Sequence, residues 1–163
     1  MSILGLITLS AALAAAVLQR GSATDHWLTE SSALAERVPD NMACNWQSFS
    51  PTNVAIWRTS LAVERGESGA AVTELAKAVD ERKVTSRSRR AAFLIDVGRG
   101  LASEPKARTE AVSWLRRAED AGPQYVRNCP AARETVAYLL DRATATAGGR
   151  ELRGMAARMG VAH

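Results

Sequence analysis

The chain has 163 residues, enough for one domain with a buried core. Hydrophobic residues make up 47% of it, but aromatic residues only 5%. This composition favours helices that pack through small side chains, and no run of alternating β-branched residues is long enough to indicate a sheet. The net charge of +4 is uneven: residues 1–81 hold 5 Lys/Arg against 9 Asp/Glu, and residues 82–163 hold 16 against 8. We attribute the basic half mainly to a solvated surface, because its arginines are interleaved with acids.

The first predicted helix, from about Ile3 to Gln19, is apolar almost all round, and Gly21 is expected to close it. Gly21-Ser22-Ala23 also fits the cleavage site of a secretory signal peptide. However, Met1-Ser2 supplies no basic residue for such a signal, and the run is short for a membrane span. We therefore expect a buried helix, whose outer face is covered by self-association or by another chain.

A second helix is predicted from about Ala23 to Val38, with one face formed by Trp27, Ser31, Leu34 and Val38. Pro39-Asp40-Asn41 ends it. The connection that follows, from about Asp40 to Ser50, contains Cys44, Asn45, Trp46 and Phe49. Two aromatic side chains in one connection either fold it onto the helices, which we favour, or line a site.

Ser50 and Pro51 mark the start of a third helix, with Ser50 as its N-cap and Pro51 at its first position. Its apolar stripe is Val54, Trp57 and Leu61, and Gly66 is expected to end it. Ser68 is a candidate cap for a fourth helix. The residues predicted to face inward on that fourth helix are Ala71, Leu75, Ala78 and Val79.

The segment from Thr85 to Gly122 has the clearest pattern, a helix, a turn and a second helix. The break lies at Ser103-Glu104-Pro105, where Pro105 begins a helix but cannot lie inside one. Gly122-Pro123 ends the unit. The stripes of the two helices are Phe93, Leu94, Val97 and Leu101, followed by Ala107, Ala111, Trp114, Leu115 and Ala118.

Three further segments complete the chain. A short turn or helix is expected over Gln124–Asn128, and Pro130 begins another helix that Gly148-Gly149 interrupts. The stripe of the helix after Pro130 is Ala132, Val136, Leu139, Leu140 and Ala143. A last helix, Arg150 to Met159, is expected to turn Leu152, Met155, Ala156 and Met159 inward and Arg150, Arg153 and Arg158 outward.

The elements therefore read as four helical hairpins in one domain, residues 1–163. Ala71 and Ala78 match Ala111 and Ala118 at an offset of 40 residues, and Gly21 and Ala33 hold the corresponding places in the first hairpin. The expected fold class is all-α, with tetratricopeptide-like hairpin repeats forming an α-solenoid.

Ala111, Leu115, Ala118 and Pro123 have the small, large, small and terminal-proline spacing of a tetratricopeptide second helix. Longer segments are more specific: FSPTNV at 49–54, RRAAFLIDV at 89–97, EAV at 110–112 and RNCPAARE at 127–134. These segments resemble the C-terminal repeat region of actinobacterial Xre-type helix-turn-helix transcriptional regulators. The resemblance covers nearly the whole chain.

The resemblance implies a cytoplasmic, non-catalytic regulatory module that binds a protein or peptide partner or a small-molecule effector. In that family a separate N-terminal domain reads DNA, but no recognition-helix pattern occurs here. Direct DNA binding by this chain is therefore not expected. The alternative is a DNA-associated regulator that acts through its basic C-terminal half. Arg87, Arg89 and Arg90 form a basic cluster there, but they lack the interleaved aromatic residues of a nucleic-acid surface.

The sequence offers little for catalysis. Its histidines are His26 and His163, and we interpret His26 as a packing or capping residue. There is no phosphate loop, metal-ligand cluster or nucleophile elbow, so no metal and no cofactor are expected. Gly98 and Gly100 are interpreted as close helix contacts. The two cysteines, Cys44 and Cys129, are expected to be reduced thiols rather than a disulfide.

In a solenoid the first helix of each hairpin lines the concave groove, which gives the candidate binding residues. Asn53 is a candidate for hydrogen bonding to a peptide backbone, and Trp46 and Trp57 are candidate apolar anchors. Arg99 is expected to receive a carboxylate, with Asp96 orienting it from three residues earlier. The alternative is that Asp96 and Arg99 are an ordinary helix-surface pair and that Trp57 belongs to the core.

Overall fold

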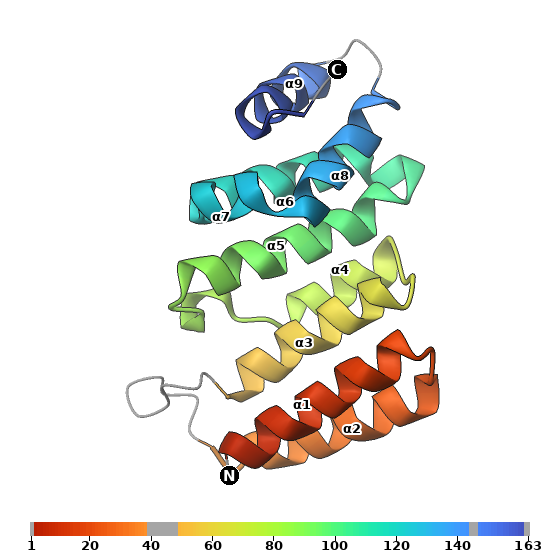
Figure 1. The fold of residues 1–163 in the computed structure, drawn as a ribbon, viewed down its shortest axis with the longest axis vertical. Coiled ribbons are helices and arrows are strands. Elements are labelled where there is room, and N and C mark those ends of the chain that lie inside the picture. The colour runs from red at the N-terminus through yellow and green to blue at the C-terminus, as the bar shows by residue number, and fades with distance from the viewer. Residues whose placement is uncertain (1, 39–48, 144–146, 162–163) are drawn as a thin grey trace. The chain divides into compact units, whose positions relative to one another are not determined.

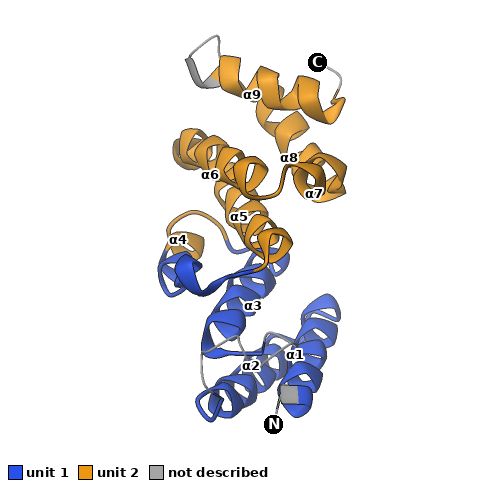
Figure 2. Ribbon diagram, turned by 90° about the vertical axis from the view of Figure 1, so that its left-hand side faces the viewer, with its two compact units in different colours: residues 1–67, 74–85 blue, residues 68–73, 86–163 orange. Residues whose placement is uncertain are grey.

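A computed structural model describes residues 2–38, 49–143 and 147–161, and these residues form helices and no strand (Figure 1). The all-α prediction is confirmed. The chain divides into two compact units, residues 1–67 with 74–85 and residues 68–73 with 86–163 (Figure 2). Helix α4 (Ala70–Lys77) is shared between the two units.

The first unit begins with a helical hairpin, α1 (Ser2–Val17) and α2 (Gly21–Ala35). The prediction that Gly21 ends the first helix is wrong, because Gly21 begins α2. The turn is instead made at Gln19, which has a φ of 56°. The backbone N–H of Gln19 donates to the carbonyl of Ala16 and that of Arg20 to Ala15, both at 2.9 Å. This pair of bonds caps the last carbonyls of α1, so a left-handed glutamine replaces the expected glycine.

One face of α1 packs against α2 and α3 (Pro51–Glu64) in a small apolar core. A Cβ atom on Gly5 would lie 2.0 Å from Cζ of Phe49, so the ring of Phe49 occupies the space that a side chain at residue 5 would need. Phe49 is therefore folded onto the helices, as predicted. The buried core residues are Leu9, Ala12, Ala16, Leu28, Ala35, Phe49, Val54 and Leu61.

The inward face of α2 is rotated from the predicted one. Thr24, Leu28, Ser31 and Ala35 are buried, whereas Trp27 and Leu34 pack half-buried at the edge of the core and Ala33 is exposed. Small polar residues are tolerated inside because their hydroxyl groups are paired. Thr8 and Ser31 share a hydrogen bond of 2.7 Å between α1 and α2. Satisfied hydroxyls and alanine-sized side chains thus let the two helices approach closely.

Both ends of α3 agree with the sequence. The N–H of Asn53 donates to Oγ of Ser50 at 3.2 Å, and Pro51 is the first helical residue. Gly66 has a φ of +88° and ends the helix. The N-cap and the C-terminal glycine are local devices that need no tertiary contact, which explains why the sequence predicts them.

Replacing Ser50 by alanine is expected to lower the free energy of unfolding by about 1 kcal/mol, because the amide of Asn53 loses its acceptor at the start of α3. Urea denaturation followed by circular dichroism measures this change. The matched control is Ser113→Ala, an exposed site within a helix, which should change stability by less than about 0.5 kcal/mol. An equal loss in both variants would contradict the capping role.

The inward face predicted for α4 is right only in part. Val79 is buried as predicted and Leu75 is half-buried, but Ala71 and Ala78 are exposed, and Val72 and Ala76 are buried instead. Adjacent residues on a helix lie about 100° apart, so a shift of one position exchanges an inward residue for an outward one. The valines carry more apolar surface than the neighbouring alanines, and burying them is the more favourable choice. The predicted repeat offset of 40 residues assumed that Ala71 and Ala78 face inward, so their exposure removes its basis.

The second unit is built on the hairpin of α5 (Arg87–Ala102) and α6 (Arg108–Ala121), joined by the short 3₁₀ helix η3 (Pro105–Ala107). Its predicted stripes are buried, apart from the half-buried Ala107 and Trp114. A Cβ atom on Gly98 would lie 2.9 Å from Cγ of Leu115 and 3.4 Å from the carbonyl oxygen of Ala111. The prediction that Gly98 marks a close helix contact is confirmed.

The chain then forms α7 (Pro123–Asn128), α8 (Pro130–Leu140) and α9 (Ala147–Met159). The inward residues predicted for α9 are all buried. Two predictions in this region are wrong. Gly148 and Gly149 lie within the first turn of α9 instead of interrupting a helix, and Ala143 is exposed beyond the end of α8. Another short 3₁₀ helix, η2 (Glu81–Lys83), belongs to the first unit.

A charged pocket beside helices α6, α7 and α9

The second unit contains a pocket of about 860 Å³ whose lining is dominated by charged side chains. The chain reverses at Gly122 and begins α7 at Pro123, which places the end of α6 beside α7. Residues four apart on α9, at 150, 154 and 158, share the helix face that completes the pocket. The lining residues are Arg116, Glu119, Asp120, Pro123, Arg127, Arg150, Glu151, Gly154 and Arg158.

Glu119 is the buried centre of this lining, with a side chain that is 7% exposed. Arg158 donates to both of its oxygens, from Nε at 2.8 Å and from Nη2 at 2.7 Å. Arg127 adds a third bond from Nε at 3.1 Å. The bonds from Arg158, followed by that from Arg127, lower the pKa of Glu119, although burial alone would raise it. The carboxylate therefore stays charged and ties α7 and α9 to α6.

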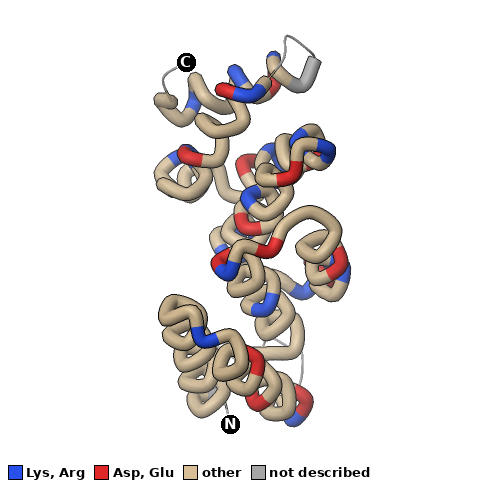
Figure 3. Tube along the Cα trace, turned by 90° about the vertical axis from the view of Figure 1, so that its right-hand side faces the viewer, with Lys and Arg blue, Asp and Glu red and all other residues tan. Residues whose placement is uncertain are grey.

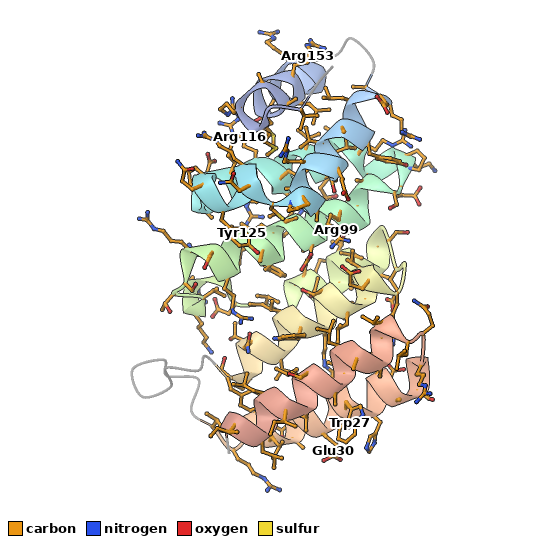
Figure 4. The ribbon with its side chains drawn as sticks, in the orientation of Figure 1. Trp27, Glu30, Arg99, Arg116, Tyr125 and Arg153 are labelled. Atoms are coloured by element: carbon orange, nitrogen blue, oxygen red, sulfur yellow. The ribbon has the colours of Figure 1, made fainter. Side chains whose placement is uncertain are left out.

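A second, more exposed pair lies at the rim of the pocket. Nη1 of Arg116 on α6 donates to Oε1 of Glu151 on α9 at 2.7 Å, and its Nε lies 4.0 Å from Oδ2 of Asp120. Figure 4 labels Arg116 on the side of α6 that faces α9. Its side chain is 61% exposed, so solvent screens this pair much more than the pairs of Glu119.

Arg150 is left with no ion pair among the residues that the structure describes. The pocket lining holds four arginines and three carboxylates, so its formal charge is +1. Arg150 also lies in the first turn of α9, where the helix dipole disfavours a cation and favours an anion. The pocket is therefore suited to an anionic group that pairs with Arg150. Its lining contains no histidine or thiol that would serve as a base or nucleophile.

The binding residues predicted from sequence do not line this pocket. Asp96 and Arg99 form the expected pair within α5, with Oδ1 of Asp96 3.2 Å from Nη1 of Arg99. Their side chains are 19% and 27% exposed, so the pair is partly sheltered. Arg99 is labelled on α5 in Figure 4. This geometry fits the alternative of an ordinary i,i+3 helix pair at least as well as a ligand site.

The other predicted binding residues belong to the first unit or lie outside the described residues. Asn53 is buried on α3, and Trp57 is half-buried against the core of the first unit. Trp57 therefore agrees with the core alternative, and a buried Asn53 is poorly placed to receive a peptide. Trp46 lies outside the described residues, so its role stays a prediction.

The sequence did not indicate Glu119 as a site residue. Arg158 is exposed, as predicted, but its pairing with Glu119 was not foreseen. The available signal was an acid at an inward position: Val112, Leu115 and Glu119 have the 3-4 spacing of one helix face, and all three are buried. An acid on such a face requires a cationic partner. The pattern does not identify that partner, because Arg158 is 39 residues away in sequence.

The remaining residues considered for chemistry are His26 and the two cysteines. His26 is exposed, with its ring centroid 5.1 Å from that of Trp27. Cys129 is a free, half-buried thiol, and Cys44 lies outside the described residues. Within the described ranges, no group of three or more histidine, cysteine, aspartate or glutamate residues is placed to hold a metal ion. Nor does any helix in those ranges have the length and apolar character to cross a membrane.

Comparison of the chain with protein-family models, with curated proteins and with solved structures finds no match.

Proposed function

We propose that the chain is a non-catalytic binding module of tetratricopeptide-like hairpins, and that its charged pocket receives an acidic group of a partner. The observation that carries this proposal is Arg150, which pairs with no carboxylate within the described part of the chain and lines a pocket whose other arginines are held by carboxylates. A carboxylate-bearing protein, peptide or small-molecule effector supplies the missing counter-charge. The ion pairs of Glu119 fix the surrounding wall, so little reorganisation is needed on binding.

The repeat arrangement is supported by a burial pattern that recurs on the second helix of each predicted hairpin. Residues at i, i+4 and i+7 are buried in each case, with Val79 just beyond the end of α4, and the triplets begin at residues 24, 72, 111 and 152. The spacing after residue 72 is close to 40 residues, in line with a helical-hairpin repeat longer than the tetratricopeptide's roughly 34. The buried triplets are Thr24, Leu28 and Ser31; Val72, Ala76 and Val79; Ala111, Leu115 and Ala118; and Leu152, Ala156 and Met159.

A regulatory role in the cytoplasm follows from the resemblance to the repeat region of Xre-type regulators and is part of the same proposal. Repeat regions of this kind bind partners along a surface of helices, and this module does so without a reaction step. Under this proposal the acidic partner acts as the effector. The proposal assigns no chemistry to His26 or Cys129.

The alternative of DNA binding through the basic half is not favoured. Arg89 and Arg90 of the predicted basic cluster are half-buried on α5, and burial lowers the pKa of Arg89. Three of the four pocket arginines, Arg116, Arg127 and Arg158, are paired with carboxylates. Paired and buried cations are poor partners for phosphates, because each phosphate contact must first displace a carboxylate or draw the arginine out.

The proposal predicts that Arg150→Glu weakens binding of acidic peptides at least tenfold, because an attraction becomes a repulsion inside the pocket. The measurement is fluorescence anisotropy with a labelled peptide of glutamate and glycine, compared with the same peptide carrying glutamine. The matched control is Arg153→Glu, the same charge reversal at an exposed position of α9 outside the pocket (Figure 4). Equal losses in the two variants, or equal binding of the two peptides, would contradict the proposal.

A further inference from the structure

Two arginines from different helices contact the ring of Tyr138 on α8 in the second unit. Cζ of Arg142, just beyond the end of α8, lies 3.9 Å from the ring centroid of Tyr138. Cζ of Arg108, the first residue of α6, lies 5.9 Å from the same centroid. Both distances are those of cation–π contacts. The two guanidinium groups are therefore at most about 10 Å apart, so one small ligand can reach both. These three residues are called the tyrosine platform below.

The platform carries positive charge without a counter-charge. Within the described ranges, neither of its arginines forms an ion pair with a carboxylate. Acids are not scarce on these helices, since acidic positions occur among the basic ones (Figure 3). Glu110, the acid in the first turn of α6, instead accepts a hydrogen bond from Nε1 of Trp114 at 3.3 Å. Ala107 gives α6 no side-chain cap, and the helix dipole at this end favours an anion.

The contacts with the ring leave hydrogen-bond donors of both arginines available. A guanidinium stacks through its face, whereas its N–H donors lie in its plane and point away from the ring. Nε of Arg108 is buried, and the two terminal amino groups donate no hydrogen bond within the described part of the chain. Nη1 of Arg142 donates to the carbonyl of Tyr138 at 3.3 Å, which leaves its Nε and Nη2 for a ligand. The ring therefore orients two sets of donors before any ligand binds.

This arrangement suits a phosphate group better than a carboxylate. A phosphate monoester carries a charge of about −1.5 to −2 at pH 7 and three acceptor oxygens, so it can accept from two guanidinium groups at once. A carboxylate has one charge and two oxygens, which a single bidentate guanidinium already satisfies. The platform differs in this respect from the charged pocket, whose lining supplies three carboxylates of its own.

From these observations we infer that the tyrosine platform of Arg108, Tyr138 and Arg142 is a binding site for a phosphate monoester. The inference goes beyond the proposed function, because none of these residues lines the charged pocket. It does not restore the alternative of DNA binding. Two arginines around one ring contact a single phosphate group, whereas a duplex is bound through many phosphates at once.

Titration of the ¹⁵N-labelled full chain with a phosphoserine–glycine peptide tests the inference, read at the side-chain Nε–H signals of Arg108 and Arg142. A dissociation constant of about 1 mM is expected for a single phosphate group. Arg108→Gln and Arg142→Gln should each weaken binding about tenfold, because each removes one of the two charges. The matched control is Arg133→Gln, at an exposed position of α8 outside the platform, which should change the affinity by less than about twofold. Equal losses in the three variants overturn the inference, as does a wild-type chain that does not bind.

Tyr138→Leu tests whether the ring, and not charge alone, makes the site. This variant keeps both arginines but should bind the phosphopeptide about tenfold more weakly, because the guanidinium groups lose their fixed orientation. Tyr138→Phe keeps the ring and should retain the affinity within about twofold. Circular dichroism verifies that both variants fold. Unchanged affinity in Tyr138→Leu overturns the platform.

Other ligands identify the source of the phosphate and separate this site from the charged pocket. Inorganic phosphate and adenosine monophosphate should shift the same two arginine signals, and whichever of the phosphopeptide and the nucleotide binds more tightly is the source class. The glutamate–glycine peptide should shift Arg150 and leave the platform unchanged. Equal binding of that peptide at Arg108 and Arg142 overturns the preference for phosphate. Arg150→Glu should leave phosphate binding at the platform unchanged, so the two sites can fail independently.

Discussion

Replacing Glu119 by glutamine is expected to lower the free energy of unfolding by about 2 kcal/mol at pH 7, because three charge-assisted hydrogen bonds are weakened and two arginines lose their counter-charge. Arg127 and Arg158 are 36% and 46% exposed and can turn to water, which keeps the cost below that of a fully buried pair. Urea denaturation of the two proteins measures the difference.

The effect of this substitution should depend on pH in a defined direction. The pKa of Glu119 is lower in the folded chain than the value of about 4.3 expected for an unfolded glutamate. Its stabilisation is therefore complete above about pH 4.3 and is lost as the pH falls through the lower folded-state pKa. The difference between wild type and Glu119→Gln should shrink over the same interval.

Glu151→Gln is the matched control for Glu119→Gln, because Glu151 contacts one arginine that is 61% exposed. Its cost is expected to be below about 1 kcal/mol. Equal costs for the two glutamine variants would contradict the central role of Glu119 in the pocket wall. A difference between wild type and Glu119→Gln that does not change with pH would contradict the lowered pKa.

Replacing Gly98 by leucine is expected to destabilise the second unit by about 3 kcal/mol, because a side chain there must enter the space filled by Leu115. The carbonyl of Ala111 bounds the same space and is backbone, so it cannot move aside as a side chain does. The measurement is again urea denaturation, and the hairpin of α5 and α6 is the element expected to loosen.

Two further variants make this prediction specific. Gly21→Leu places the same side chain on a helical glycine with no heavy atom within 4 Å of the added Cβ, and it should cost less than about 1 kcal/mol. Adding Leu115→Ala to Gly98→Leu frees volume at the contact and should restore part of the lost stability. No rescue, or an equally large effect at Gly21, would show that the helices do not meet closely at Gly98.

The features that the sequence predicted well are determined locally. Ser50 with Pro51 begins a helix and Gly66 ends one, because a cap and a left-handed glycine act within a few residues. The α5–α6 hairpin was also predictable, because Phe93 and Ala111 belong to strongly apolar stripes. Helix-capping residues and apolar periodicity therefore account for the helices and for this hairpin.

The features that the sequence did not predict are those for which two neighbouring residues could fill the same structural role. Ala71 and Val72 are both apolar neighbours on α4, so periodicity alone does not decide which one faces inward. Gln19 takes the left-handed conformation that glycine usually supplies, although Gly21 is two residues away. On α4 the packing of other helices selects the outcome.

The candidate site was harder to predict than the fold. Asp96 and Arg99 were found because their spacing of three residues brings them together on any helix. The pairs of Glu119 with Arg127 and Arg158 join three helices, and no local pattern reveals them. The pocket is thus a product of tertiary packing, and the predicted groove residues on α3 and α5 were selected without that information.

Nuclear magnetic resonance titration of the ¹⁵N-labelled chain with the glutamate–glycine peptide shows directly whether the charged pocket binds an acidic partner. We expect chemical-shift changes that gather at the end of α6, on α7 and on α9, with Arg150 among the largest, and that vanish when glutamine replaces glutamate in the peptide. Changes centred instead on Asn53 and Trp57, or on Asp96 and Arg99, would contradict it. So would a spectrum that the peptide leaves unchanged.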